Sequence, residues 1–550
     1  MSGARGSGPS RVARARMLVA ALAAMVAALV VVLLATGGGP SSPTATVRFL
    51  PTAAQRPLPA GPATGGRPAN VVLLLTDDQT LADMEVMPRT RQLVGGAGAT
   101  FDQYRVSFPL CCPARATILT GQYSHNSGVL GNNPPLGGYG ALVRHGERKT
   151  VPFALSHRRR QPYRTAHIGK YLNGYGKPRH RGIPPGWTDW YGATEAYRMW
   201  GYQLNENGKL KTYGQRRVED PRFYQTDVFR RKAVRFVRGQ AAPGRAPFFL
   251  SLSFVAPHSE TGLERPFPGR NPRSAPRHRG QLADEPLARP PSFDEADMSD
   301  KPAWLNWRHP LGAAGIEKIT ARYRARRESL LAVDEAVAAI VGALRESGQL
   351  QRTYVIFTSD NGFFHGEHRV PGGKLLAYEP ATHVPMMIRG PGIPAGVRSE
   401  LPAGDVDLGA TILDMTRTRA RWPLDGRSLL DHLRPRLRAQ LEQRPMLQEI
   451  GPSAAGGDLD QDGGSVGVRL SGPRIPQYWG VLQSGIRYVR YEDGSEELYD
   501  LRRDPDELAS KHADPSYAAT KRALQTELER LRHCRGPSCR APAPPLPRPR

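Results

Sequence analysis

Two short apolar runs, residues 70–75 and 353–358, constrain the fold of this 550-residue chain more than any other feature. Each consists mainly of Val, Leu, Ile or aromatic residues without polar alternation, which is typical of a strand buried on both faces. A third strand is predicted at residues 248–254. Just before the last of these strands, apolar residues recur at the spacing of a core-facing helix: Leu330, Val333, Val337, Ile340 and Leu344. The sequence therefore predicts an α/β fold.

Side chains with oxygen ligands follow each of the apolar runs at residues 70–75 and 353–358. Asp77 and Asp78 come after the first, and Asp360 and Asn361 come after the second. Ligands of α/β sheets bind at the carboxyl ends of strands, so we expect these four side chains to converge on one hard cation. Ca²⁺ suits an all-oxygen set with an amide carbonyl better than Zn²⁺ does. For either pair alone, a helix cap or a turn after a strand is the alternative interpretation.

A cysteine is predicted at the N-terminus of a helix in the segment 111–115, Cys-Cys-Pro-Ala-Arg. Pro113 suits the first helical turn, and Gly121 can end the helix. Free backbone N–H groups and the helix dipole at Cys111 favour an anionic nucleophile and an anionic substrate group. Arg115 can donate to their oxygens as a rigid fork. The alternative is a pair of structural thiols in a turn.

The same segment fits the C-x-P-[SA]-R signature, and the chain resembles the type I sulfatases of the alkaline phosphatase superfamily. Further similarities follow in family order from about residue 68 to about residue 392: Gly169-Lys170-Tyr171-Leu172-Asn173, Ala256-Pro257-His258-Ser259, Gly366-Glu367-His368 and Gly373-Lys374. Segments 110–113, 122–126 and 169–173 resemble most closely the branch of N-acetylglucosamine-6-sulfatases and extracellular heparan-sulfate 6-sulfatases. The resemblance implies a large mixed, mostly parallel sheet flanked by helices, with a smaller C-terminal α+β subdomain that contains an antiparallel sheet.

The resemblance also implies a modified nucleophile. In this family a dedicated maturation enzyme oxidises the residue that corresponds to Cys111 to formylglycine, whose hydrated aldehyde attacks sulfur. The implied ligands of one Ca²⁺ are the modified Cys111 and the four oxygen donors Asp77, Asp78, Asp360 and Asn361. Arg115 is expected to support the diol, and the residues implied to bind sulfate and handle protons are Lys170, His258 and Lys374.

These assignments give a coherent reaction on a sulfate monoester. A diol hydroxyl, relieved of its proton by Asp360, attacks sulfur, and His258 or Lys374 protonates the departing alcohol. The second hydroxyl then allows the carbonyl to re-form and sulfate to leave. Many arylsulfatases carry a histidine, a candidate base for this elimination, where this chain has Leu172. The base is left open among four histidines near the motifs: His125, His167, His365 and His368.

The amino end is predicted to direct export. Arginines in the first 16 residues precede an apolar run at residues 17–36, the pattern of an export signal. About twenty apolar positions also reach membrane-spanning length, so residues 1–36 are either a cleaved signal peptide or a single membrane anchor. Residues 37–67 follow as a linker. We expect an extracellular or cell-surface protein, with the export machinery and the maturation enzyme as partners.

The remaining organisation follows from local patterns. The catalytic domain is expected at residues 68–433, the C-terminal subdomain at 434–540 and a disordered Pro-rich tail at 541–550. Residues 262–310, rich in Pro and Arg, predict a long loop that could shape substrate access. Cys534 and Cys539 are suited to a small disulfide loop in an exported protein, which leaves Cys112 as a thiol.

Within the subdomain, three segments predict an antiparallel meander, and three leucines mark a closing helix. These are residues 480–482, 486–491 and 497–501, then Leu524, Leu528 and Leu531. Asp458, Asp460 and Asp462 resemble the start of an EF-hand loop, but the twelfth position is Arg469 rather than Glu, so an exposed loop is expected.

The net charge of +26 is compatible with a polyanionic partner such as a sulfated glycan. Nucleic acid is not expected, because no motif of a nucleic-acid-binding domain is present and export argues against it. Two alternatives to the sulfatase interpretation remain at this stage. One is a phosphonate monoester or phosphodiester hydrolase of the same superfamily, and the other is a non-catalytic, basic glycan-binding protein.

Overall fold

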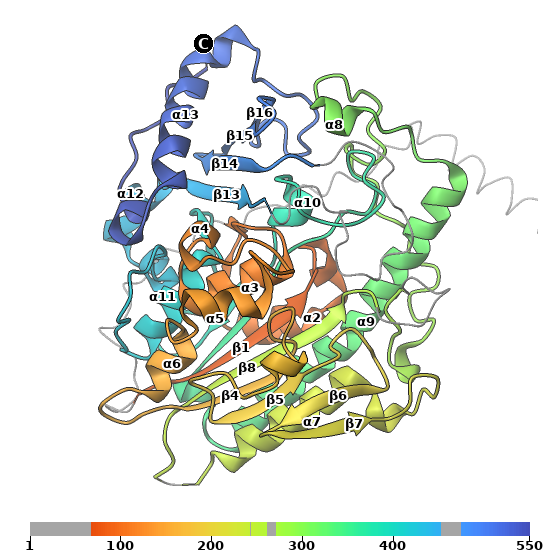
Figure 1. Ribbon diagram of the computed structural model, residues 1–550, viewed down its shortest axis with the longest axis vertical. Helices are drawn as coiled ribbons and strands as arrows, with labels where there is room; N and C mark the ends of the chain where they lie inside the picture. Colours follow the sequence, from red (N-terminus) through yellow and green to blue (C-terminus); the bar gives the residue numbers. More distant parts are fainter. Residues whose placement is uncertain (1–67, 243, 261–270, 453–474, 550) are drawn as a thin grey trace, which may run out of the picture. The chain divides into compact units, whose positions relative to one another are not determined.

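The computed structural model describes residues 68–242, 244–260, 271–452 and 475–549, which belong to one compact unit (Figure 1). The expected signal peptide or anchor, the linker and the EF-hand-like segment lie outside the described residues. Within the described residues, every helix is too short or too polar to span a membrane.

The main sheet has ten strands in the order β11-β2-β10-β9-β1-β8-β4-β5-β6-β7. Its central strands, β9, β1, β8, β4 and β5, run parallel, and antiparallel pairings flank them on both sides. The strands are β1 (Asn70–Asp77), β2 (Ala99–Phe101), β4 (Arg164–Gly169), β5 (Asp189–Ala193), β6 (Tyr202–Glu206), β7 (Lys209–Tyr213), β8 (Phe248–Pro257), β9 (Thr353–Ser359), β10 (Met386–Arg389) and β11 (Val397–Ser399). This confirms the expected mixed, mostly parallel sheet and its three predicted strands.

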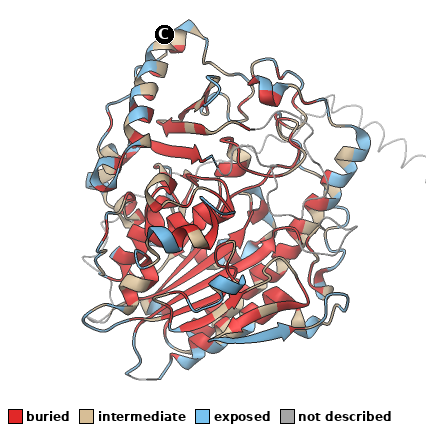
Figure 2. Ribbon diagram, in the orientation of Figure 1, coloured by how far each residue is buried: buried red, intermediate tan, exposed pale blue. Residues whose placement is uncertain are grey.

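The continuous apolar sequence of β1 follows from helices on both faces of the sheet. Val71 and Leu73 belong to one core, whereas Val72 and Leu74 belong to the other. The first core packs under α3 (Cys111–Thr120), α5 (Gly138–Gly146), α6 (Val151–Ser156) and α11 (Val406–Met415), and the second under α7 (Gln225–Gly239) and α9 (Ala313–Glu346). Alternate side chains of a strand point to opposite faces, so a strand covered on both sides is apolar along most of its length. The ribbon of the central strands is coloured as buried in Figure 2.

The C-terminal subdomain contains the expected antiparallel sheet and closing helix. Its strands are β13 (Met446–Ile450), β14 (Tyr478–Gln483), β15 (Ile486–Tyr491) and β16 (Glu496–Asp500), and its helix is α13 (Ala518–Arg532). The sequence did not predict β13. The predicted disulfide between Cys534 and Cys539 is present.

Residues 541–549 differ from the expected disordered tail. They form neither helix nor strand, but Leu546 packs on the core of the subdomain. The Gln483 amide donates a hydrogen bond to Pro544 O, and the Thr520 hydroxyl donates one to Pro547 O. Proline cannot donate a backbone hydrogen bond, but its carbonyl accepts one, which is how this segment is held.

Short elements complete the fold. They are β3 (Tyr104–Arg105), β12 (Ala403–Gly404), α2 (Pro88–Thr90), α4 (Ser124–Ser127), α8 (Ala303–Asn306), α10 (Glu379–Thr382) and α12 (Arg438–Glu442). The described part of the predicted loop at 262–310 contains α8 and one turn of 3₁₀ helix, and its backbone bonds to the segment after β9, where Asp294 N donates to Gly366 O.

Candidate active site

The carboxyl ends of four neighbouring strands meet one helix N-terminus. Ligand atoms of Asp77, Asp78, Cys111 and His258 all lie within 4.8 Å of one another, and all four residues are buried. Asp360 and Asn361 join this group through Asp78, whose backbone N–H donates to Asp360 Oδ1 (3.1 Å) and whose Oδ1 accepts from Asn361 Nδ2 (2.7 Å). The chain thus forms a buried acidic cluster that also contains a cysteine and a histidine.

Cys111 is the first residue of α3, as the motif predicts. Its neighbour Leu110 is extended, and Gly121 ends the helix with φ 66° while its N–H donates to Thr117 O. Cys111 Sγ lies 3.3 Å from Asp77 Oδ1 and 3.9 Å from Asp78 Oδ1, and Lys374 Nζ donates to the same sulfur at 2.9 Å. The helix therefore presents the sulfur to both a carboxylate pair and a cation.

Arg115, one turn into α3, is fixed by three elements. Its Nε donates to Asp360 Oδ2 at 2.7 Å, its Nη1 donates to Lys170 O at 2.9 Å, and its Nη2 lies 3.4 Å from Asp77 Oδ2. These contacts connect α3 with the ends of β9, β4 and β1. The position of the helix relative to the sheet is thereby set by buried, charge-assisted hydrogen bonds.

Buried cations balance the carboxylates. Lys170 Nζ lies 2.5 Å from Asp77 Oδ2, and Lys374 Nζ lies 2.5 Å from Asp78 Oδ1. Burial alone would raise the pKa of Asp77, but Lys170 and Arg115 outweigh burial and hold that pKa well below its usual range. Burial and the negative charge of Asp77 raise the pKa of Asp360 to about 6. The cluster therefore contains carboxylates in two different electrostatic environments.

Asn361 supplies an oxygen that suits a metal ion. Its Nδ2 donates to Asp78 Oδ1 and to Gly362 O, while its buried Oδ1 has no hydrogen-bond partner in the part of the chain that the structure describes. A buried amide oxygen without a partner is unfavourable unless a ligand satisfies it. An amide oxygen of this kind and the carboxylates of Asp77 and Asp78 are the donor types that suit a hard divalent cation.

His258 has a defined tautomer. A carbonyl can only accept, so the contact of 2.7 Å with Ser259 O requires a proton on Nδ1. The other nitrogen, Nε2, lies 3.6 Å from Asp78 Oδ2 and faces the cluster. Neutral His258 can therefore accept a proton on Nε2 and can donate it again.

Tyr197 is a site residue that the sequence reasoning missed. Lys170 Nζ lies 4.4 Å from the centre of its ring, and the ring of His258 lies 4.5 Å away. Asn173 Nδ2 donates to the Tyr197 hydroxyl at 3.1 Å. Unlike the buried Lys170 and His258, Tyr197 is partly exposed. It lies in an irregular segment after β5, where no motif marks it.

The four candidate histidines for the elimination step occupy different environments. His125 contacts Glu449 of β13, and His167 packs against Trp190. His365 and His368 line a cavity next to the C-terminal subdomain. Burial lowers the pKa of His167 to about 3. His167 is therefore neutral at physiological pH.

Cys112, the second cysteine, and Leu172, which stands where many arylsulfatases have a histidine, have structural roles. Burial raises the pKa of Cys112 to about 12, so its thiol stays protonated. Cys112, the second residue of α3, and Leu172 both pack in the core between α3 and the sheet.

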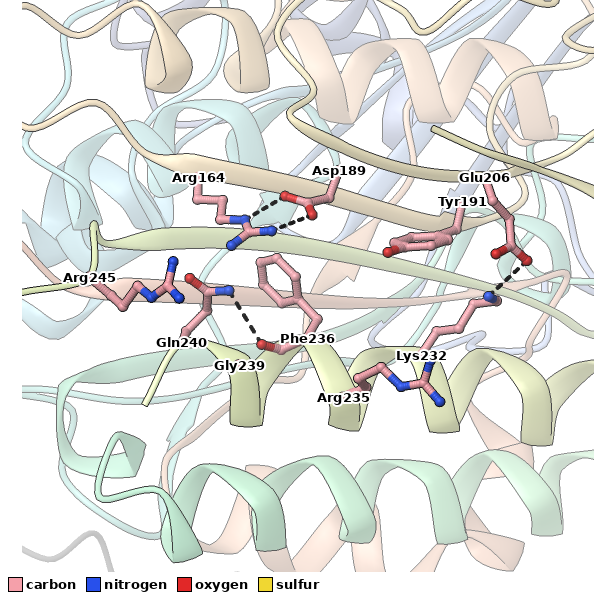
Figure 3. Close-up of a pocket in the computed structure, with 10 residues that line it drawn as sticks. All are labelled: Arg164, Asp189, Tyr191, Glu206, Lys232, Arg235, Phe236, Gly239, Gln240 and Arg245. Atoms are coloured by element: carbon pink, nitrogen blue, oxygen red, sulfur yellow. Dashed lines mark hydrogen bonds and ion pairs between the residues drawn. The ribbon is translucent and has the colours of Figure 1, made fainter. Parts of the chain in front are cut away.

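Figure 3 shows a different cavity, of 360 Å³, at the amino ends of β4 and β5. Arg164 forms a two-bond contact with Asp189 there, and Lys232 pairs with Glu206. The expected site residues do not line it. The residues that the motifs predicted lie in the buried cluster rather than at this cavity.

Comparisons with known proteins agree with the motifs. The family model described as Sulfatase matches residues 69–418. The N-acetylglucosamine-6-sulfatase of Homo sapiens is 30% identical over 505 residues, which is 88% of each chain. An extracellular sulfatase SULF-1 homolog of Drosophila melanogaster is 33% identical over 366 residues, 66% of this chain and 31% of that protein. A solved structure described as BT4656 in complex with its substrate D-glucosamine-2-N,6-O-disulfate has a TM-score of 0.65, with 23% identity over 84% of this chain and 97% of that chain.

Proposed function

The chain belongs to the sulfatase family, and we propose that this sulfuric ester hydrolase acts on 6-O-sulfated glucosamine-type sugars through a formylglycine derived from Cys111 and a bound Ca²⁺. The observation that supports the proposal most directly is the position of Cys111 Sγ, 3.3 Å from Asp77 Oδ1 at the start of α3. The substrate class rests on what the similar proteins are described as hydrolysing or binding.

The proposed ion would be held by the oxygens of Asp77, Asp78, Asp360 and Asn361 together with residue 111. It would supply positive charge that polarises a sulfate oxygen and favours an ionised nucleophile. Lys170, Lys374 and Arg115 add three fixed cations around the same point. Because these cations are buried and already oriented by carboxylates, they can stabilise charge on a sulfate without reorganisation.

The chain's own groups can move the required protons. Asp360, with its raised pKa, is the proposed acceptor of the proton from the nucleophile. His258 Nε2, which faces the cluster, is the proposed donor to the departing alcohol, with Lys374 as the second candidate. Tyr197 packs on both Lys170 and His258 and would hold their orientation.

The proposal extends to organisation and location. Residues 68–433 would form the catalytic domain and residues 434–540 the subdomain that completes it. An export signal or anchor at residues 1–36 would place the enzyme at the cell surface or outside the cell, and a maturation enzyme would be needed to convert Cys111.

Peptide mass spectrometry across residue 111, combined with a sulfate-release assay, tests the proposal. We expect an aldehyde at position 111 and release of sulfate from 4-nitrophenyl sulfate, and C111A should lose activity by at least about 10³-fold. Fully active protein with an unmodified thiol at position 111 would contradict the proposed formylglycine nucleophile. A preference for 4-nitrophenyl phosphonate esters by orders of magnitude would instead support the phosphonate hydrolase alternative.

A further inference from the structure

The exposed face of α7 is strongly basic. Five of the 15 residues of this helix are Arg or Lys and one is Asp; the basic residues are Arg230, Arg231, Lys232, Arg235 and Arg238. Arg231, Arg235 and Arg238 are exposed and follow one another at spacings of four and three residues, so they share one face of the helix. A rise of about 1.5 Å per residue spreads them over about 10 Å of the helix axis. The helix therefore presents a row of positive charges to solvent.

Two adjoining cavities open beside this row. The cavity of 360 Å³ in Figure 3 is lined by Arg235 and, from the segment before β8, by the exposed Arg245. Its two carboxylates already pair with Arg164 and Lys232. The other cavity, of 480 Å³, is lined by four arginines of α7, and its lining includes no carboxylate of the described residues. Because Arg235 lines both cavities, they form one continuous basic surface.

Three arginines of this surface have no acidic partner. In the part of the chain that the structure describes, no Asp or Glu pairs with Arg231, Arg235 or Arg245. Arg231 donates to a backbone carbonyl, which leaves its charge uncompensated. On α13, by contrast, Arg530 and Arg532 each pair with the glutamate three residues earlier. The middle of α7 therefore carries positive charge that other parts of the protein do not neutralise.

These charges also act on one another. Burial lowers the pKa of Lys232, and the positive charges of Lys211 and Arg235 lower it further, although Glu206 opposes them. Arg231 and Arg235 lie four residues apart, and like charges at that spacing destabilise a helix. A ligand with several negative charges would relieve both effects.

The basic surface lies at the opposite edge of the sheet from the active site. Arg164, which also lines the cavity in Figure 3, is the first of the six residues of β4, and Lys170 follows the last. Six residues of extended strand span about 20 Å. A ligand on α7 would therefore not contact the reacting sulfate.

The form of the surface suits a flexible sulfated chain better than a membrane. Guanidinium groups bind the oxygens of an anion through paired N–H donors, and adjoining cavities would let successive anionic groups of one chain reach different arginines. Peripheral membrane helices add large apolar side chains to their basic ones. None of the large exposed apolar side chains of the described residues lines either cavity.

We propose that the basic face of α7, together with Arg245, binds a sulfated polysaccharide away from the active site and retains the enzyme on polymeric substrate. The choice of polymer rests on the proposed function, whereas binding at this surface requires neither formylglycine nor turnover. Arg231, Arg235 and Arg245 provide most of the attraction, because the anion displaces no carboxylate from them.

The test measures binding of size-defined heparin oligosaccharides to protein produced without the maturation enzyme, which keeps the Cys111 thiol. R231A/R235A/R245A should raise the Kd by about tenfold at about 0.1 M salt, the sum of three exposed ion pairs. The Kd of this variant should also depend less steeply on salt, because fewer counterions are released on binding. R231K/R235K/R245K keeps the charges and should retain most of the binding.

The matched control is R436A/R522A/R548A. It removes three exposed arginines of the C-terminal half that likewise have no acidic partner within the described ranges, so the net charge falls by the same amount. Its Kd should stay within about twofold of the wild-type value, because charges further away than about 10 Å are screened at 0.1 M salt. An equal loss of binding in both alanine variants would mean that net charge alone attracts the glycan, and would overturn the inference. An unchanged Kd in R231A/R235A/R245A would overturn it as well.

Two further measurements separate this inference from its alternatives. Vesicles rich in phosphatidylserine should bind more weakly than heparin; stronger binding that R231A/R235A/R245A abolishes would assign the surface to a membrane and overturn the proposal. In matured enzyme, the same variant should hydrolyse 4-nitrophenyl sulfate within about twofold of the wild-type rate, because the two sites lie further apart than the screening length. If matured enzyme releases no sulfate, the proposed function fails, while heparin binding to the thiol form still decides the role of α7.

Discussion

At the scale of single residues, the cluster around Cys111 consists of charges that are stable only together. Three carboxylates and three basic side chains are buried within a few ångströms, and each basic side chain contacts at least one carboxylate. Removing one member of a buried pair leaves an unpaired charge, which commonly costs about 3–5 kcal/mol. Substitutions of the neutral members therefore give cleaner tests of function than substitutions of the charged ones.

Asn361→Ala is such a test for the proposed ion. Loss of the unpaired amide oxygen should weaken Ca²⁺ binding by about tenfold, or about 1.4 kcal/mol. A saturating ion stabilises the folded wild type by about 2.7 kcal/mol at a hundred times its Kd, so thermal unfolding with calcium and with EDTA measures the difference. N361A should show a smaller calcium-dependent rise in Tm. Asn306, which is exposed on α8, serves as the control in N306A. An equal rise in Tm for all three proteins would exclude Asn361 as a ligand.

Tyr197 permits a second test, because its ring and its hydroxyl can be separated. Y197F keeps the ring over Lys170 and beside His258, and loses the hydroxyl that accepts a hydrogen bond from Asn173. Y197L loses the ring. A desolvated cation–π contact is worth up to about 2 kcal/mol, so kcat/KM should fall by about tenfold or more in Y197L and by less than about threefold in Y197F. A changed pH–rate profile in Y197L alone would identify an effect on His258. Equal losses in both variants would mean that the hydroxyl is the important group.

At the scale of elements, the sequence predicted best those strands that are buried on both faces, because burial restricts them to apolar residues. β1 and β9 are covered on both faces, so their apolar composition predicted them, and the carboxylates at their ends could be placed at one edge of the sheet. β13 was not predicted, because Met446–Ile450 includes Gln448 and Glu449 and carries no apolar run. Tyr197 was missed for a related reason: its role arises from packing between the ends of β4 and β8, which local sequence does not encode.

The contact between α4 and β13 predicts a pH-dependent stability. His125 Nδ1 lies 3.0 Å from Glu449 Oε2, and its Nε2 contacts Cys534 O. Burial would lower the pKa of His125, but Glu449 outweighs burial and raises it to about 9. The folded state therefore binds this proton more tightly than the unfolded state, whose histidine pKa is about 6.5. The resulting stability is fully present below pH 6.5 and is lost as the pH rises through about 9.

Urea unfolding at pH 6 and at pH 9.5 measures this contribution. The pKa shift of His125 corresponds to at most about 3 kcal/mol in the free energy of unfolding. H125Q should lose most of the difference in unfolding free energy between the two pH values. H533Q, at an exposed histidine of the same subdomain, is the control and should retain the wild-type difference. If H125Q and the wild type lose the same stability between the two pH values, the His125–Glu449 pair is not the cause.

At the scale of the whole molecule, the proposed nucleophile is enclosed by the complete fold. Cys111 is 0% exposed, and all ten residues of α3 are buried. Segments as distant as residues 77 and 374 contact its sulfur. A motif can identify this residue, but its enclosure depends on contacts that form only when the chain has folded, so the order of modification and folding is a property of the entire structure.

This enclosure predicts that oxidation of Cys111 precedes folding. An enzyme that acts on the thiol must bind the surrounding segment, and exposing a helix that is buried along its whole length requires opening close to global unfolding. Protein that is folded first and then incubated with a formylglycine-generating enzyme should therefore keep the Cys111 thiol. Peptide mass spectrometry should find less than about 1% of that residue converted to formylglycine. A peptide of residues 105–121 should be converted under the same conditions, as should the chain when it is produced together with the enzyme. Conversion of the folded chain at the rate of the peptide would show that α3 opens locally. Since Arg115 anchors α3 to three strand ends, such opening would also contradict the geometry on which the proposed site depends.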